Sequence, residues 1–277
     1  MKKLKSMLLL LFAVLLFSCG TQKTADNPQE QASSKLDIVG EEVSYATDST
    51  EMKGYIVYDK NMEGKRPGII VVHEWWGHNE YTRRRADMLA ELGYTALAID
   101  MYGDGKQAEH PDDAGKFMNQ VISNMDEANA RFMKALETLK NHPTVSEENI
   151  AAVGYCFGGS VVLTMANAGY DLKAVAAFHS GVQLPIPPSA DIKAKILVCN
   201  GAADPFISPE SVVQFKAAMD SVGADYTYIA YDSAVHAFTS PDADDLGEKF
   251  GLPLAYNEKA DNASWAELQT LLTAVFE

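Results

Sequence analysis

Most of the sequence alternates between short apolar runs and amphipathic helical segments. GIIVVHE, TALAID, NIAAVGY, KAVAAFH and AKILVCN have the composition of strands that are buried on both faces. Segments between them, such as YTRRRADMLAELG, carry apolar residues at helical spacing. Strands that alternate with helices form a mostly parallel central sheet with helices on both faces. The sequence therefore predicts an α/β fold whose functional side chains gather at the carboxyl ends of the strands.

Residues 36–277 are predicted to form one domain, because α/β folds commonly run to roughly 200–250 residues without splitting. Two segments with period-2 alternation, EEVSYAT and KGYIVYD, predict an antiparallel hairpin before the parallel strands. Helices are expected around 114–122, 124–140, from Gly158 onward, over PESVVQFKAAMDSVG and near 265–276.

The N-terminus has the layout of an export signal. A basic start and an apolar run from Met7 to Phe17 precede the small residues Ser18, Cys19 and Gly20. The run is too short to span a bilayer core of roughly 30 Å. A cysteine at this place resembles the lipobox of bacterial lipoproteins, so we expect a signal peptide at 1–18, lipidation of Cys19 and a polar tether at 19–35. The alternative is an ordinary cleaved signal with a stray cysteine.

Export with lipidation would place the protein in the bacterial cell envelope, anchored in a membrane on the periplasmic or outer-surface side. A net charge of −15 argues against nucleic acid as a partner. The chain has 3 cysteines, too few to suggest a disulfide framework. The thiols therefore need another explanation.

Cys156 lies in VGYCFGGS, directly after the apolar run that ends at Gly154. With Gly158, this segment reproduces the G-x-S-x-G pattern with cysteine in place of serine. In that pattern the nucleophile occupies a sharp strand-to-helix turn, where side chains two residues away would clash with the adjoining strand and helix. The N-terminus of the helix that follows would favour the thiolate. The alternative is a buried structural cysteine, which is the better interpretation of Cys199 in ILVCN.

A base and an orienting acid are expected to follow the nucleophile in the order acid, then histidine. Asp204 follows the strand AKILVCN, and His236 follows the strand DYTYIAYD. Both would lie on loops at strand carboxyl ends, as the chemistry requires. The alternatives are a turn residue before Pro205 and a solvated loop histidine.

Five segments in this order resemble the dienelactone hydrolase family of the α/β-hydrolase fold. They are VVHEWWGHNEYTRRRADMLAELGYTALAIDMYGDG, VGYCFGGS, NGAADPFI, YDSAVHAF and AYNEKADNASW. The resemblance implies that fold and a catalytic triad of Cys156, Asp204 and His236. It also implies a role for Glu74, whose counterpart in the family holds the resting thiol and accepts its proton when substrate arrives.

Glu74 ends the strand GIIVVHE and begins a loop that would supply half of an oxyanion hole. Backbone N–H groups of Phe157 and Trp75 are expected to form that hole. The alternative for Glu74 is an exposed carboxylate that caps the following helix. Trp76 and Tyr102 are candidates for the lining of an apolar pocket, although aromatic residues at strand ends are equally often core.

Other polar residues near these motifs are expected to be structural. His73 and His179 end strands and are interpreted as satisfied structural histidines that border the pocket at most. The run from Arg83 to Arg85 is expected to lie on a solvated helix face, with salt bridges to the acidic surface.

The family holds an anionic substrate with two arginines, whose positions correspond to Asp104 and Ser240 in this chain. Neither residue binds a carboxylate as a guanidinium does. We therefore expect a carboxylic ester hydrolase that acts on neutral esters or lactones and needs no cofactor or metal. The alternative is a non-catalytic envelope binding protein that retains the hydrolase fold.

Overall fold

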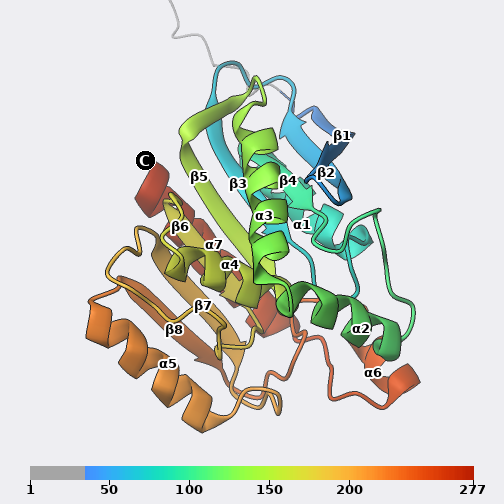
Figure 1. Cartoon of the computed structure of the whole chain (residues 1–277), viewed down its shortest axis with the longest axis vertical. Helices are drawn as coiled ribbons and strands as arrows, with labels where there is room; N and C mark the ends of the chain where they lie inside the picture. The colour runs from blue at the N-terminus through green and yellow to red at the C-terminus, as the bar shows by residue number, and fades with distance from the viewer. Residues whose placement is uncertain (1–34) are drawn as a thin grey trace, which may run out of the picture. The chain divides into compact units, whose positions relative to one another are not determined.

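An eight-stranded sheet runs through residues 35–277, the part of the chain that the computed structural model describes (Figure 1). The strand order is β1-β2-β4-β3-β5-β6-β7-β8, and every neighbouring pair from β4 to β8 is parallel. β1 and β2 form an antiparallel hairpin, and β2 pairs antiparallel with β4. The strands are β1 (Ile38–Ala46), β2 (Glu51–Asp59), β3 (Arg66–Val72), β4 (Thr95–Ile99), β5 (Val145–Tyr155), β6 (Ala174–Phe178), β7 (Lys195–Gly201) and β8 (Tyr226–Tyr231).

Helices cover both faces of the sheet, which confirms the predicted architecture. They are α1 (Glu80–Glu91), α2 (Pro111–Ile122), α3 (Met125–Lys140), α4 (Phe157–Asn167), α5 (Pro209–Val222), α6 (Ala243–Phe250) and α7 (Glu258–Phe276). Side chains of α3, α4 and α5 pack in one apolar cluster with Ile70 of β3, and those of α1 and α7 pack in a second cluster with Ile69. Because side chains alternate along a strand, these two neighbours face opposite layers of the core.

The predicted hairpin and the helices around 114–122 and 124–140 are present with shifts of a few residues. Two elements differ more. α7 begins at Glu258, where the Asn257 side chain accepts a hydrogen bond from the Ala260 N–H, about two turns before the predicted start. The short helix α6 was not predicted, and the segments around it contribute only a small apolar cluster.

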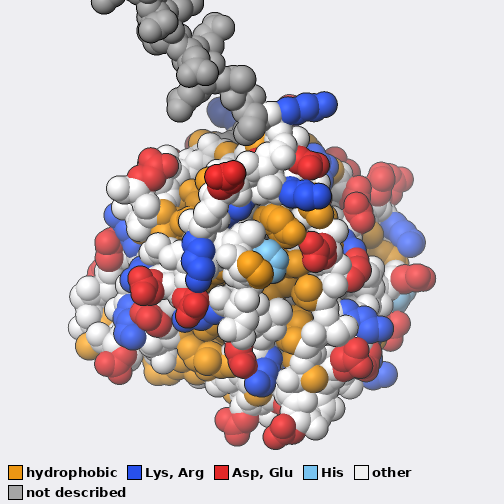
Figure 2. All heavy atoms as spheres, turned by 90° about the horizontal axis from the view of Figure 1, so that it is seen from above, with side chains coloured by type: hydrophobic (Ala, Val, Ile, Leu, Met, Phe, Trp, Pro, Cys, Tyr) orange, Lys and Arg blue, Asp and Glu red, His pale blue; other side chains and the backbone are white. Residues whose placement is uncertain are grey.

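The surface carries charges of both signs. Figure 2 shows the side toward the top of Figure 1, where acidic and basic side chains are interspersed around a hydrophobic area. Within residues 35–277, no helix combines the length and the apolar character needed to span a membrane. The predicted signal peptide, Cys19 and nearly all of the predicted tether lie outside the described residues.

Candidate active site

Cys156 occupies the sharp turn between β5 and α4. Its backbone has φ of 53° and ψ of −115°, a region that residues other than glycine rarely adopt. A Cβ atom on Gly154 would lie 2.1 Å from the Gly158 carbonyl oxygen, and one on Gly158 would lie 2.3 Å from the Val72 carbonyl oxygen. The glycine spacing therefore lets strand, turn and helix pack in direct backbone contact, with the thiol at the N-terminus of α4.

Cys156, His236 and Asp204 lie together although 80 residues separate the first two in sequence. The His236 Nε2 atom is 3.1 Å from the Cys156 Sγ atom, and its Nδ1 atom is 2.8 Å from Asp204 Oδ2. Burial disfavours the imidazolium, but the negative charge of Cys156 and the bond to Asp204 prevail and raise the pKa of His236 to about 10. His236 therefore holds a proton between a sulfur and a carboxylate at neutral pH.

The loop after β3 approaches the start of α4, as an oxyanion hole requires. In the described part of the chain, neither the Trp75 N–H nor the Phe157 N–H donates to a protein acceptor. The loop is held by a hydrogen bond from the Tyr102 hydroxyl to the Trp75 carbonyl oxygen at 2.9 Å, and by one from the Gly77 N–H to the Glu74 carbonyl oxygen at 3.2 Å. Both N–H groups are thus available, and their catalytic role remains a prediction.

The two pocket candidates are mostly buried. Tyr102 is 5% exposed, and its hydroxyl supports the loop rather than an open cavity. Trp76 stacks on Phe250 of α6, with the ring centroids 6.0 Å apart. Phe206 is 55% exposed and lies edge-on to the His236 ring. Sequence reasoning missed both phenylalanines, although Phe206 stands two residues after Asp204.

Glu74 is buried, with 3% of its surface exposed, so the alternative of an exposed capping carboxylate is wrong. The cap of α1 is Asn79, whose side chain accepts from the Thr82 N–H. Both Glu74 and Cys156 lie in the part of the chain that the structure describes, and no hydrogen bond joins their side chains. Burial raises the pKa of Glu74 to about 7, although the charges of His236 and Arg85 oppose the shift.

His73 fixes the backbone around Glu74. Its Nε2 atom accepts from the Met101 N–H at 3.2 Å, so its Nδ1–H donates to the Glu74 carbonyl oxygen. Burial lowers the pKa of His73, in agreement with a neutral ring. This histidine is structural, as the sequence predicts.

A buried chain of hydrogen bonds lies behind Glu74. Arg85 only donates, so its Nε–H donates to the Tyr81 hydroxyl. The Tyr81 hydroxyl is hydrogen-bonded to the Thr239 hydroxyl, which is hydrogen-bonded to Nε2 of His179. Burial lowers the pKa of His179 well below its ordinary value. Its Nε2 atom is 4.0 Å from a Glu74 carboxylate oxygen, so Glu74 faces a neutral ring.

For Arg85, the prediction of a solvated helix face is wrong. Arg85 is 4% exposed, and its guanidinium forms a buried ion pair with Asp261 of α7 at 2.6 Å. Arg83, two residues earlier, forms the expected surface ion pair with Glu42. The physical reason is helical spacing, because Arg85 lies on the same face of α1 as the buried Tyr81 and Leu89.

Replacement of Glu74 by glutamine should change how stability depends on pH. The folded-state pKa of about 7 exceeds the ordinary value of about 4.3, so the contribution of Glu74 is fully present below pH of about 4.3 and is lost as the pH rises through 7. From pH 5 to pH 8, the free energy of unfolding of Glu74→Gln should therefore rise by about 2–3 kcal/mol relative to the parent. Urea unfolding of both chains measures this difference, and parallel pH profiles would contradict it.

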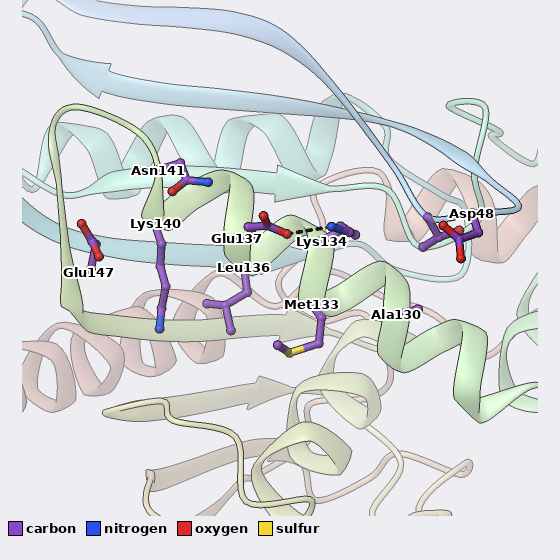
Figure 3. A pocket seen from close by; sticks show the side chains of 10 residues that line it. Asp48, Ala130, Met133, Lys134, Leu136, Glu137, Lys140, Asn141 and Glu147 are labelled. Atoms are coloured by element: carbon purple, nitrogen blue, oxygen red, sulfur yellow. Dashed lines mark hydrogen bonds and ion pairs between the residues drawn. The ribbon is translucent and has the colours of Figure 1, made fainter.

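A larger hollow lies elsewhere, between α3 and the turn that joins β1 to β2 (Figure 3). Its volume is about 550 Å³. Lys134 and Glu137 form an ion pair along its wall at 2.8 Å. Glu147, also in the wall, stands near the start of β5, roughly 30 Å along the strand from Cys156. This hollow is separate from the thiol.

Comparison with known proteins identifies the family and the fold. Residues 52–276 match the dienelactone hydrolase family. The chain is 30% identical to the protein usf of Aquifex pyrophilus over 213 residues, 75% of this chain and 90% of that protein. A crystal structure described as a dienelactone hydrolase-like promiscuous phosphotriesterase, P91 from metagenomic libraries, is 31% identical with a TM-score of 0.81, covering 87% of this chain and 99% of P91. The structure described as m3DLH has 33% identity and a TM-score of 0.82 at the same coverage. The chain therefore belongs to the dienelactone hydrolase family and is a hydrolase with the α/β-hydrolase fold.

Proposed function

We propose that the protein hydrolyses neutral carboxylic esters or lactones with Cys156 as the nucleophile. The observation that carries this proposal is the geometry at the turn before α4. The Cys156 Sγ atom lies 3.1 Å from a histidine nitrogen, and the other nitrogen of that ring lies 2.8 Å from a buried carboxylate. A nucleophile, a base and an orienting acid within hydrogen-bond distance are what acyl transfer requires.

In the proposed reaction, the Cys156 sulfur forms a bond to the carbonyl carbon, and the π electrons move to the carbonyl oxygen. The N–H groups of Phe157 and Trp75 stabilise that oxyanion. The oxyanion collapses and breaks the carbon–oxygen bond, and the leaving oxygen takes a proton from His236. Water then attacks the thioester and gives a proton to His236, and a second collapse releases the carboxylic acid and the thiolate.

We propose that Glu74 acts beside this triad. With a pKa of about 7, its carboxyl group exchanges a proton near neutral pH. This property supports the family role, in which the carboxylate accepts the thiol proton and leaves the thiolate beside the protonated His236.

A negative charge on the substrate should lower the rate. Asp104 has a side chain 64% exposed and pairs with Lys106, while Ser240 is buried, so neither position offers a guanidinium. For opening of the lactone ring, we expect a carboxylated dienelactone to have a kcat/KM roughly 10- to 100-fold below that of its own methyl ester, in which a methyl group removes the charge. Steady-state kinetics on the two compounds measure this ratio. Equal values would contradict the preference for neutral substrates and would leave the proposed thiol mechanism unaffected.

Thiol alkylation distinguishes the enzyme from a binding protein that only retains the fold. Cys156 is partly accessible, whereas Cys199 is fully buried and burial raises its pKa to about 12. Iodoacetamide near neutral pH should therefore label Cys156 at least roughly 100-fold faster than Cys199. Mass spectrometry of the full chain resolves the peptides, including that of Cys19. The rate of ester hydrolysis should fall in proportion to the labelling of Cys156. Full activity after complete labelling would contradict Cys156 as the nucleophile.

We also propose that the protein is exported and anchored in the envelope through a lipid on Cys19. The support is the sequence of the first 20 residues alone, with its basic start, apolar run and following cysteine. Cys19→Ser should then move the protein from the membrane fraction to the soluble fraction. An unchanged membrane fraction would contradict the lipid anchor.

A further inference from the structure

An apolar pocket begins at Phe157, the residue whose N–H we expect to hold the oxyanion. Its cavity volume is about 40 Å³. One wall is a single face of α4, with Phe157, Val161 and Thr164 at helical spacing. The facing wall is the corner between α2 and α3, which contributes Ile122 and Ala128. The pocket therefore runs along α4 away from the thiol at its N-terminus.

The proposed reaction fixes which part of an ester points this way. The leaving oxygen must lie near His236, because it takes its proton from that ring. His236 and Asp204 come from loops after β8 and β7, on one side of β5 in the sheet. α2 and α3 join β4 to β5, so they lie over the other side (Figure 1). The acyl part of the substrate therefore extends from the carbonyl toward the α2–α3 corner.

The rim of the pocket exposes a large apolar side chain. Ile122 is 47% exposed at the end of α2, while Val121 beside it is buried in the pocket wall. An exposed isoleucine at the mouth of an apolar cavity extends the surface on which an alkyl group loses contact with water. No charged side chain lines this pocket.

We propose that this pocket binds the acyl chain of the substrate and selects esters with short, unbranched alkyl chains. This inference rests on the proposed function, because it assigns one part of the same substrate. A cavity of about 40 Å³ accommodates a few methylene groups and no long chain. Each methylene that enters it should raise kcat/KM by about fourfold.

The test compares the acetate, butyrate and octanoate esters of p-nitrophenol, hydrolysed by the full chain. Butyrate should exceed acetate by roughly tenfold in kcat/KM, and octanoate should bring no further gain. Ala128→Leu fills the pocket and should bring the ratio of butyrate to acetate close to one. Ala130→Leu is the matched control, because it makes the same change on the same helix outside this pocket, and it should keep the ratio.

A second variant covers the case in which Ala128→Leu does not fold. Ile122→Ala trims only the exposed rim and should lower the butyrate-to-acetate ratio about threefold, whereas Val213→Ala, at a 67% exposed position on α5, should not. A parent ratio near one, or equal ratios in Ala128→Leu and Ala130→Leu, would overturn the acyl pocket while leaving the thiol mechanism standing.

If no ester is turned over, the proposed function fails and the pocket is still tested. Chloromethyl ketones with methyl, propyl and heptyl groups present the same carbonyl and alkyl chain to Cys156 and alkylate it without turnover. The propyl compound should label Cys156 roughly tenfold faster than the methyl compound in the parent and in Ala130→Leu, and equally fast in Ala128→Leu. Equal rates in the parent would overturn the inference.

Discussion

Replacing Cys156 with alanine should lower kcat for ester hydrolysis by at least about 10³-fold and leave the fold intact. The thiol is the group that His236 contacts at 3.1 Å, and alanine leaves the base without a nucleophile. The fold should survive because cysteine and alanine carry the same Cβ atom at the strained φ of 53°. Stopped assays on a neutral p-nitrophenyl ester measure the loss, and circular dichroism of the variant serves as the control for folding.

Cys156→Ser is the sharper variant, because it keeps an atom that can accept the same hydrogen bond. A hydroxyl is far less acidic than a thiol, so it forms no ion pair with His236, and we expect a loss of roughly 10²-fold or more. In both variants the negative charge beside His236 disappears, and its pKa should fall from about 10. Retention of more than a tenth of the parent activity in Cys156→Ala would show that Cys156 is not the nucleophile.

The fold could be predicted because its signals are local. A few neighbouring residues determine each strand and each helix, and the alternation of strands with helices predicts a parallel sheet. The turn at Cys156 is equally local, since the strand, both glycines and the start of α4 fall within eight residues of VGYCFGGS. Asp204 and His236 were found as loop residues after strands, and the sheet order places those loops on one edge.

The surroundings of the site could not be predicted in the same way, because they depend on contacts between distant segments. Thr239 joins Tyr81 to His179 across separations of 158 and 60 residues, and nothing local marks it as a contact between them. Arg85 did carry a signal. It stands four residues after Tyr81 and four before Leu89, on the buried face of α1, but a run of three arginines obscures that spacing.

Arg85→Met should lower the free energy of unfolding by about 3–5 kcal/mol. This is the largest stability effect that we expect at a position where the sequence predicts an exposed side chain. The change leaves the Asp261 carboxylate buried without its cation and removes the donors to the Tyr81 hydroxyl and the Thr239 carbonyl oxygen. Arg83→Met is the matched control on the same helix. It breaks an exposed ion pair with Glu42 and should cost less than about 1 kcal/mol.

The double variant Arg85→Met/Asp261→Leu tests whether the two side chains stabilise the fold as a pair or independently of each other. Removal of both charges leaves no unpaired carboxylate in the core, so the double variant should be less destabilised than the sum of the single variants, by about 1–3 kcal/mol. Chemical denaturation of the four chains gives this coupling energy, and additive losses would contradict a buried pair. Because the positive charge of Arg85 opposes the rise in the pKa of Glu74, the double variant should recover stability but not the environment of Glu74. Its pH profile of unfolding should therefore differ from that of the parent around pH 7, where the Glu74 carboxyl group titrates.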